Sequence, residues 1–464
     1  MAFDIALCPR EVPSVSTRYR TIKTPIPVPE SIPLLKEMAA CEPRSMGGQP
    51  SVIWDRAKDF SIWDPYGNRW IDFSSGVLVT NAGHAADEIV RAVRDQVDRE
   101  LLHSYCFPNQ PRIDLARKLR SLSPPPLEKV FLLTTGAEAT ECAFKLARTY
   151  GNRIGGPQKI TMISFENAFH GRTLGAQIIG GIPSLKEWIV NVDPNVVQVP
   201  FPDGWRNTET DFSTFERRLS ELGVSGDQVC GVITETYQGG MACFAPKEYI
   251  QNLRAWCDRH KALLIFDEVQ AGFGRTGTFW GFEHYGVCPD MMCLGKGISS
   301  SLPLSAVVGR TDVMDLYGPG EMTSTHSANP VACRAALGSI ERIEKDGLVE
   351  QAAVLGRRMH EELQGILNRH SACIGAVLGK GLVAGIMFVQ TGTKEPAPAI
   401  AAAVTLRCVE KGVMLFCPVG PGGGTIKINP PLCISEEALM EGLEVFEEAV
   451  SEIETEMSLG AYDT

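Results

Sequence analysis

The sequence lacks the features that mark several large classes of protein. None of its 14 cysteines forms a C-x-x-C pair, which disfavours structural zinc sites and dithiol redox motifs. It has no apolar run of about 18 residues, so a transmembrane helix is not expected. Its 44 basic residues are outnumbered by 55 acidic ones, and the net charge of −11 disfavours binding to nucleic acid or to an anionic membrane.

Signals for nucleotide cofactors and for secretion are also absent. No G-x-G-x-x-G follows the first predicted strand and no G-K-[ST] occurs, so an NAD-dependent enzyme and a P-loop enzyme are set aside. The first residues lack a basic segment followed by a long apolar stretch, which disfavours a secretory signal. The cysteines are scattered through apolar stretches such as 229–233, as expected of free buried thiols in a reducing compartment. We therefore expect a cytoplasmic protein.

The chain of 464 residues is long enough for two or three domains. Residues 1–75 combine a proline-rich arm with a strand-and-turn pattern. Residues 76–330 alternate short apolar strands with helices, which predicts a large α/β domain with a mainly parallel sheet and helices on both faces. Residues 331–464 carry long helical patterns with short strands between them, which predicts a smaller α+β domain.

Two segments place possible ligand contacts directly after predicted strands. One strand runs into a turn of small residues at Thr135, Gly136 and Ala137, which opens a helix. The unpaired N–H groups of such a turn attract an anion, and the helix dipole adds to the attraction. After a later strand, Phe169 is expected at the carboxyl edge of the sheet, where an aromatic ring can stack on a planar cofactor. Taken alone, each segment is more simply an ordinary connection with one buried side chain.

Two further strands end in charged residues. Asp267 follows four apolar residues, and a carboxylate there is costly unless it is paired, for example with a cationic ring nitrogen. A helix cap or a surface ion pair is the alternative, and no histidine or cysteine cluster indicates a metal. Lys296 lies between two glycines after an apolar strand, and a desolvated lysine reacts with aldehydes. Together the four segments supply what is needed to hold pyridoxal 5′-phosphate (PLP), with Lys296 as the Schiff-base residue.

The amino-acid sequences of these segments resemble those of a known family. Residues 267–277 read D-E-V-Q-A-G-F-G-R-T-G, and Lys296 stands in G-K-G. From Ser51 to Glu447 the chain resembles the class III (ornithine and 4-aminobutyrate type) aminotransferases. The resemblance implies a fold-type-I PLP-dependent transferase, with a large PLP-binding domain and a small domain built from both chain ends.

The resemblance also implies roles for the residues around the cofactor ring. Lys296 matches the lysine that forms the Schiff base and then shuttles a proton. Asp267 matches the acid that pairs with the pyridinium nitrogen. Gln270 matches the residue bonded to the phenolic oxygen of the ring, and Phe169 matches the stacking aromatic residue.

The resemblance implies that the phosphate has contacts from two subunits. Thr135, Gly136 and Ala137 occupy the positions of the phosphate loop, with Thr135 in place of the usual serine. Thr325 matches a threonine that reaches the phosphate of the neighbouring subunit. An obligate homodimer with its active sites at the interface is therefore expected.

The residues expected to select the substrate depart from the family pattern. Arg172 matches an arginine that binds the distal acid of the substrate in some relatives and does not touch it in others. Glu235 matches a glutamate that pairs with a carboxylate-binding arginine, but Lys427 stands at the position of that arginine. Lysine keeps the charge and loses the bidentate fork that grips an α-carboxylate, which puts the usual binding of 2-oxoglutarate in question. Thr236 replaces a proline, and serines at 299–301 stand where relatives often carry glycines.

Amino-group transfer is the predicted reaction, from an amino acid or ω-amine donor to a keto acid or aldehyde acceptor. The alternative is a PLP-dependent lyase or racemase/epimerase on the same scaffold, which would keep Lys296 and Asp267 but expel a leaving group or reprotonate the substrate carbon. The unusual Lys427 favours this alternative. A non-catalytic scaffold protein is disfavoured because Lys296 and Asp267 are both present.

Overall fold

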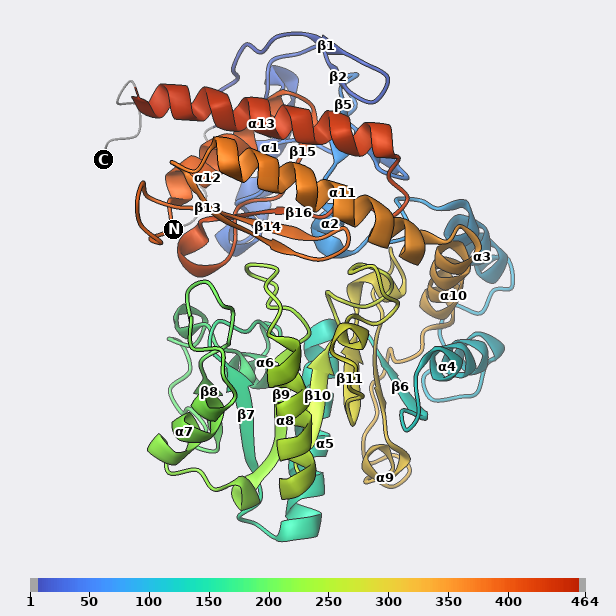
Figure 1. The fold of residues 1–464 in the computed structure, drawn as a ribbon. Helices are drawn as coiled ribbons and strands as arrows, with labels where there is room; N and C mark the ends of the chain where they lie inside the picture. Colours follow the sequence, from blue (N-terminus) through green and yellow to red (C-terminus); the bar gives the residue numbers. More distant parts are fainter. Residues whose placement is uncertain (1–6, 459–464) are drawn as a thin grey trace. The chain divides into compact units, whose positions relative to one another are not determined.

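The computed structural model describes residues 7–458, which divide into two compact units. One unit runs from Asp87 to Glu350, and the other combines residues up to Ala86 with those from Gln351 onward. In Figure 1 the first of these, called here the middle unit, runs from the lighter blue of α3 through cyan, green and yellow to the light orange of α10, and the other, called the terminal unit, combines the darker blue start of the chain with its orange to red end. The terminal unit is therefore built from both ends of the chain.

A seven-stranded sheet forms the centre of the middle unit, in the order β6-β12-β11-β10-β9-β7-β8. The strands from β11 to β8 run parallel to one another, whereas β12 is antiparallel to both β11 and β6. The link between β11 and β12, residues 295–304, is too short for a helical crossover, so the chain returns antiparallel. The strands are β6 Lys129–Leu133, β7 Thr161–Phe165, β8 Val196–Val199, β9 Val229–Glu235, β10 Leu263–Asp267, β11 Met291–Leu294 and β12 Ser305–Gly309.

Helices cover both faces of this sheet, as the alternating sequence pattern predicted. In Figure 1 helix α8 lies in front of the strands and α5 behind them. The α-helices of the middle unit are α3 Asp87–Val97, α4 Gln110–Leu122, α5 Gly136–Gly155, α6 Leu174–Ile179, α7 Ser213–Glu221, α8 Lys247–His260, α9 Thr311–Met314 and α10 Pro330–Lys345.

Helix α10 belongs to the middle unit, although the sequence pattern placed a domain boundary at residue 330. It packs against α3 and α4, which hold it beside the large sheet rather than with the later helices. Gly338 allows the close approach, because a Cβ at this position would lie 2.8 Å from the carbonyl oxygen of Glu88. The Glu88 carboxylate in turn binds Lys345 Nζ at 2.8 Å. The chain divides after residue 350 for this reason.

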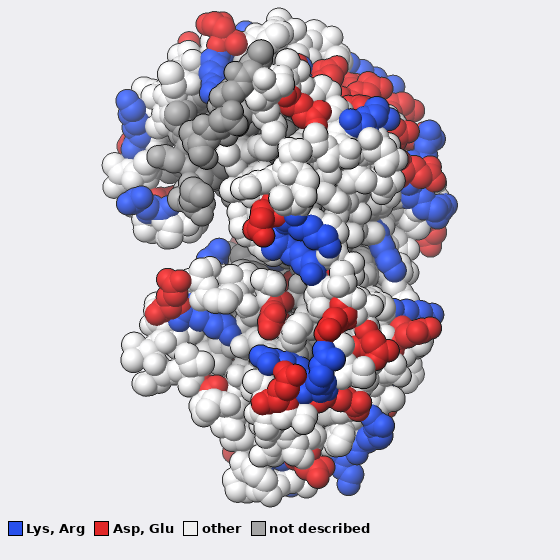
Figure 2. Space-filling view, turned by 60° about the vertical axis from the view of Figure 1, so that its left-hand side comes forward, with Lys and Arg blue, Asp and Glu red and all other residues white. Residues whose placement is uncertain are grey.

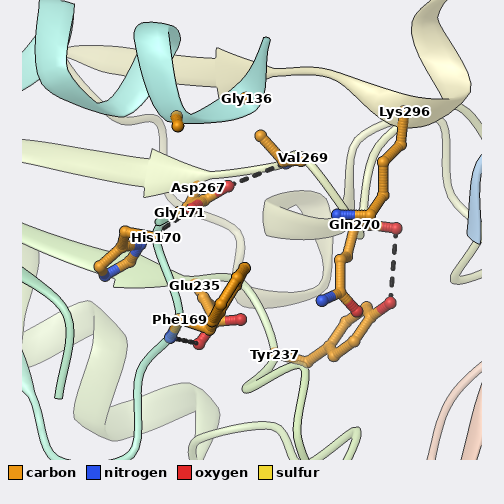
Figure 3. A pocket seen from close by; sticks show the side chains of 11 residues that line it. Gly136, Phe169, His170, Gly171, Glu235, Tyr237, Asp267, Val269, Gln270 and Lys296 are labelled. Carbon is orange, nitrogen blue, oxygen red and sulfur yellow. Dashed lines mark hydrogen bonds and ion pairs between the residues drawn. The ribbon is translucent and has the colours of Figure 1, made fainter. Parts of the chain in front are cut away.

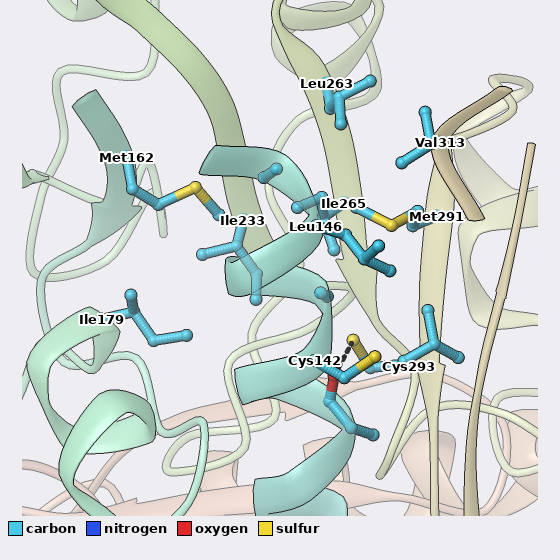
Figure 4. Packing of buried hydrophobic residues seen from close by; sticks show 14 of the residues in the cluster. Cys142, Leu146, Met162, Ile179, Ile233, Leu263, Ile265, Met291, Cys293 and Val313 are labelled. Atoms are coloured by element: carbon cyan, nitrogen blue, oxygen red, sulfur yellow. Dashed lines mark hydrogen bonds between the residues drawn. The ribbon is translucent and has the colours of Figure 1, made fainter. Parts of the chain in front are cut away.

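The apolar stripe of α5 forms the core of the middle unit. Cys142 and Leu146, one turn apart, face the strand residues Ile233, Ile265 and Cys293 (Figure 4). Burial raises the pKa of the Cys142 thiol to about 12, so this cysteine is an uncharged packing residue. All 14 cysteines are free thiols and most are buried, as the sequence predicted.

The terminal unit contains two smaller sheets and the remaining helices. The first has the order β1-β2-β5-β4-β3, with β15 parallel to β5, and the second has the order β13-β14-β16. Its strands are β1 Val15–Ser16, β2 Thr21–Ile22, β3 Arg56–Lys58, β4 Ser61–Trp63, β5 Arg69–Asp72, β13 Ile374–Gly379, β14 Ala384–Phe388, β15 Val413–Met414 and β16 Thr425–Ile428. The helices are α1 Ile32–Cys41, α2 Ser75–Leu78, α11 Leu348–Arg369, α12 Pro398–Glu410 and α13 Glu436–Ser458.

The surface carries charges of both signs. On the face shown in Figure 2, acidic and basic side chains are interspersed. Across residues 7–458, no helix is both long enough and apolar enough to span a bilayer.

Candidate active site

The carboxyl ends of the parallel strands meet at a cavity of about 160 Å³ in the middle unit (Figure 3). Parallel strands bring their carboxyl ends to one edge, which is where open α/β sheets bind ligands. The cavity brings together seven of the predicted site residues, namely Gly136, Ala137, Phe169, Glu235, Asp267, Gln270 and Lys296. His170, Gly171, Tyr237 and Val269 complete its lining.

Lys296 follows β11, and its side chain is directed into this cavity. Burial lowers the pKa of Lys296, while the negative charges of Asp267 and Glu235 oppose the shift. A lowered pKa increases the fraction of uncharged amine at neutral pH. Lys296 therefore has the property that a nucleophile toward an aldehyde needs.

Asp267 is the last residue of β10 and is 6% exposed. Its Oδ2 lies 2.8 Å from Nδ1 of the buried His170. Its Oδ1 accepts a hydrogen bond of 3.0 Å from the Val269 N–H. A carboxylate oxygen accepts more than one hydrogen bond, so Asp267 keeps capacity for a cationic group in the cavity.

Glu235, at the end of β9, connects two loops that border the cavity. Its Oε2 accepts from the Phe169 N–H at 3.0 Å, and its Oε1 accepts from the Gly239 N–H at 2.9 Å. Burial raises the pKa of Glu235 to about 7, and the Asp267 charge adds to the rise while His170 opposes it. Near neutral pH the carboxyl therefore exists in both protonation states, and it holds the backbone of Phe169 in place.

The first turn of α5 forms one wall of the cavity through Gly136 and Ala137. The N–H groups of a first turn have no partner within the helix and point toward a bound anion. Thr135 is the N-cap, and its hydroxyl accepts from the Glu138 N–H at 3.2 Å. Thr135 does not line the cavity, but its hydroxyl only accepts in this bond and keeps its own proton to donate, so the phosphate contact at Thr135 stays a prediction.

Close backbone approaches keep the cavity open to a flat ligand. A Cβ at Gly136 or at Gly295 would lie 3.1 Å from a methyl group of Val269. A Cβ at Gly171 would lie 2.6 Å from that of Ala137. Side chains at these positions would collide with Val269 or Ala137 beside Lys296, so the shape of the site requires glycines there.

Besides Thr135, three predicted residues lie outside this cavity. Arg172 is exposed, with its guanidinium carbon 5.7 Å from the centroid of the Phe169 ring. Thr325 is an exposed loop residue of the middle unit. Lys427 belongs to the terminal unit, where it lies on β16 and is 2% exposed.

Four cavity residues were not singled out from the sequence as site residues, namely His170, Gly171, Tyr237 and Val269. Each stands within two residues of one that was, so proximity along the chain was an available signal. Val269 follows Asp267 by two positions and packs against the glycines of the opposite walls. The Tyr237 hydroxyl donates to the main-chain oxygen of Gln270 at 3.4 Å, a contact across two loops that no local pattern reveals (Figure 3).

The residues of the cavity fit PLP by their chemistry. A helix N-terminus suits the phosphate, a buried carboxylate suits the protonated ring nitrogen, and an amine with a lowered pKa suits the aldehyde. Phe169, held by its backbone bond to Glu235, offers a flat apolar surface to the ring. No group of acidic, histidine or cysteine side chains within residues 7–458 is arranged to bind a metal ion.

Comparison with known proteins gives matches along nearly the whole chain. The profile of the family described as Aminotransferase class-III matches residues 44–450. A 4-aminobutyrate aminotransferase from Mycobacterium leprae is 35% identical over 441 residues, covering 92% of this chain and 97% of that protein. A leucine/methionine racemase from Thermococcus litoralis is 34% identical over 416 residues, covering 87% of this chain and 91% of that protein. The crystal structure of an amine transaminase from an uncultivated Pseudomonas species in its PLP-bound form has a TM-score of 0.80 at 28% identity, covering 87% of this chain and 95% of that one.

Proposed function

This chain belongs to the class-III aminotransferases, and from that premise we propose which of its residues hold PLP and carry out the transfer. The enzyme uses PLP to move an amino group from an amino acid or ω-amine donor to a keto acid or aldehyde acceptor. When bound, PLP supplies an electron sink for the carbon from which the proton is removed. The observation that carries the assignment is the presence of Lys296 and Asp267 in one buried cavity at the carboxyl edge of the sheet.

We assign the binding of PLP to four parts of this cavity. The N–H groups of Gly136 and Ala137 hold the phosphate, and Phe169 covers one face of the ring. The Asp267 carboxylate holds the proton on the ring nitrogen, and His170 supports that carboxylate through its 2.8 Å contact. Gln270 bonds the phenolic oxygen of the ring, as in the relatives that the sequence resembles.

Lys296 is assigned two tasks in each half of the reaction. Its Nζ would hold the cofactor covalently until the donor amine displaces it. The freed Nζ would then accept the proton of the donor carbon and deliver it to the cofactor rather than back to the same carbon, which allows water to release the keto product. Because burial lowers the pKa of Lys296, a larger fraction of the free amine is uncharged and able to accept this proton.

Replacement of Lys427 by arginine tests how the acceptor is selected. If Lys427 contacts the α-carboxylate, Lys427→Arg restores a bidentate grip, and kcat/KM for 2-oxoglutarate should rise by up to about tenfold, equivalent to one charge-assisted hydrogen bond. Initial rates are measured with one amino donor and a panel of keto acids and aldehydes. The values for aldehydes, which lack a carboxylate, should stay unchanged.

The same assay separates the transfer reaction from its alternative. Wild-type enzyme without any acceptor should stop after a single turnover. Continued conversion of the donor without acceptor would indicate racemisation or elimination instead. An unchanged acceptor preference in Lys427→Arg, in a variant whose melting temperature matches the wild type, would place Lys427 away from the substrate.

We further propose that the enzyme is a homodimer and that Thr325 completes the phosphate site of the partner. An exposed apolar loop supports this, since Leu102 is 52% and Phe107 is 73% exposed. This loop lies beside the one that carries Thr325: Asn329 Nδ2 donates to the Leu102 carbonyl at 2.7 Å, and Tyr105 Oη lies 3.1 Å from Thr323 Oγ1. A second copy of the chain would cover the apolar side chains and receive Thr325.

Mixed dimers test this placement of Thr325. The Thr325→Ala homodimer should bind PLP about tenfold more weakly, the effect of one lost hydrogen bond to a charged group. Thr325→Ala subunits are then co-expressed with inactive Lys296→Ala subunits under two affinity tags. One site of each mixed dimer contains both Lys296 and Thr325, so PLP affinity and activity should return at half of the sites.

The exposed neighbour Thr323 provides the matched control, because Thr323→Ala should leave PLP affinity as in the wild type. Mixed dimers no better than Thr325→Ala homodimers would show that Thr325 serves its own subunit, and a monomeric wild-type enzyme would contradict the proposal altogether.

We also propose a cytoplasmic location. All 14 cysteines are free thiols, as is usual for proteins of a reducing compartment.

A further inference from the structure

Lys296 has a backbone conformation that side-chain-bearing residues rarely adopt. Its φ of 43° lies in the left-handed region, and Ser300 at the far end of the same loop has a φ of 51°. Between them the short 3-10 helix Lys296–Ile298 is closed by a 3.0 Å hydrogen bond from the Ile298 N–H to the Gly295 carbonyl. Residues other than glycine keep a left-handed backbone conformation only where the surrounding structure holds them in it. Such residues concentrate at functional sites.

Two buried hydroxyls meet the backbone directly after Lys296. Ser300 Oγ lies 2.8 Å from Ser339 Oγ, and each of these atoms lies 3.3 Å from the carbonyl oxygen of Gly297. Ser300 is 1% exposed and Ser339 is fully buried. Each hydroxyl is placed to donate to the Gly297 carbonyl or to the other serine, so the two side chains share this acceptor.

The two serines belong to different elements. Ser300 lies in the loop itself, whereas Ser339 lies on α10, which is fixed against α3 and α4. The pair therefore ties the Lys296 loop to a rigid helix of the same unit. Neither serine lines the cavity, so any effect on the reaction passes through the backbone.

We infer that Ser300 and Ser339 are positioning residues that hold the Lys296 turn and direct its Nζ into the cavity. The inference rests on the proposed role of Lys296 as the Schiff-base lysine. The Gly297 carbonyl is remote from solvent, and a buried acceptor without a donor is costly. The two hydroxyls supply the Gly297 carbonyl with a hydrogen-bond donor. Without them the loop would relax toward ordinary backbone angles, and the Lys296 side chain would move.

The shared protons predict how the substitutions combine. Either hydroxyl alone can still donate to Gly297, so Ser300→Ala and Ser339→Ala should each change PLP uptake and kcat by less than about twofold. The double variant removes both hydroxyl donors from the Gly297 carbonyl. The rate of PLP uptake and the kcat should then each fall about tenfold, the equivalent of one hydrogen bond. The KM for the amino donor should change little, because the substrate contacts stay in place.

Two measurements probe the loop apart from turnover. Amide hydrogen exchange of residues 295–301 in the PLP-free enzyme should accelerate in the double variant only. The rate at which PLP-free enzyme gains the visible absorbance of bound PLP should fall in parallel. Ser301→Ala is the matched control, because Ser301 is an exposed serine of the same loop that bonds Ser299 rather than Gly297, and it should behave as the wild type.

Three results would overturn the inference: a double variant equal to the wild type, two single effects that simply add, or exchange that accelerates throughout α10 and not in the loop. If the double alanine variant does not fold, Ser300→Ala with Ser339→Cys retains a weak donor of similar size and should fall between the single and double variants. Full activity in Lys296→Ala would instead overturn the proposed function, so the two failures are distinguishable.

Discussion

Lys296→Ala will lose multiple turnover and the covalent link to PLP that borohydride reduces. Proton transfer by a positioned side chain is worth about 10²–10⁴-fold, so we expect a loss of at least about 10³-fold in kcat once the covalent attachment is lost as well. The cavity supplies no second amine, because Lys296 is its only lysine. Rates are followed with the best amino donor and acceptor, and peptide mapping after reduction locates the PLP label.

Two further variants sharpen this test. Lys296→Arg keeps a long cationic side chain but stays protonated, so it should be as inactive as the alanine variant. Lys247→Ala, at an exposed position where α8 begins, should retain full activity and the label. Sustained turnover by Lys296→Ala, or a label on another lysine, would rule out the assignment of Lys296.

Asp267→Ala should lower kcat by about 10²–10³-fold, the range found when one preorganised electrostatic group is removed from an active site. Without the carboxylate the ring nitrogen of PLP loses its proton, and the ring withdraws electrons less strongly from the donor carbon. Asp267→Asn should lose a similar factor, since it keeps the shape beside His170 but not the charge. The kcat should fall much more than the donor KM rises, as measured by initial rates over a range of donor concentrations.

A cofactor analogue separates the electrostatic role of Asp267 from a structural one. PLP with a methylated ring nitrogen carries a permanent positive charge, and it should recover part of the activity of Asp267→Ala. Asp258→Asn, which removes an exposed carboxylate on α8, is the matched control and should match the wild type. Full activity of Asp267→Ala with ordinary PLP would contradict the assignment.

Much of the sheet could be predicted because its strands are short apolar runs bounded by helices. The apolar stretch 229–233 lies in β9, and the helix expected after the small-residue turn at Thr135 to Ala137 is α5. The antiparallel β12 was not anticipated, because a buried strand has the same composition in either direction. The place of α10 depends on the close approach at Gly338, which is a tertiary contact.

The candidate site was predictable where each residue stands at the end of its own strand. Asp267 is the last residue of β10, and Lys296 follows β11. Because these two strands are parallel neighbours, the sheet brings the two residues together. The pairing of His170 with Asp267 joins residues far apart in sequence and depends on how the loop after β7 folds back. Thr135 also forms a capping box with Glu138, and its phosphate contact stays a prediction.

The absorbance spectrum of purified enzyme, recorded before and after addition of single amino donors without acceptor, tests the central claim most directly. Transfer of the amino group leaves it on the cofactor, so the visible band of PLP bound to Lys296 should be replaced by the stable ultraviolet band of the aminated cofactor. A keto acid should then restore the original band. A visible band that persists while the donor is racemised or loses a leaving group would contradict amino-group transfer, and protein that gains no band after incubation with PLP would contradict the cofactor assignment itself.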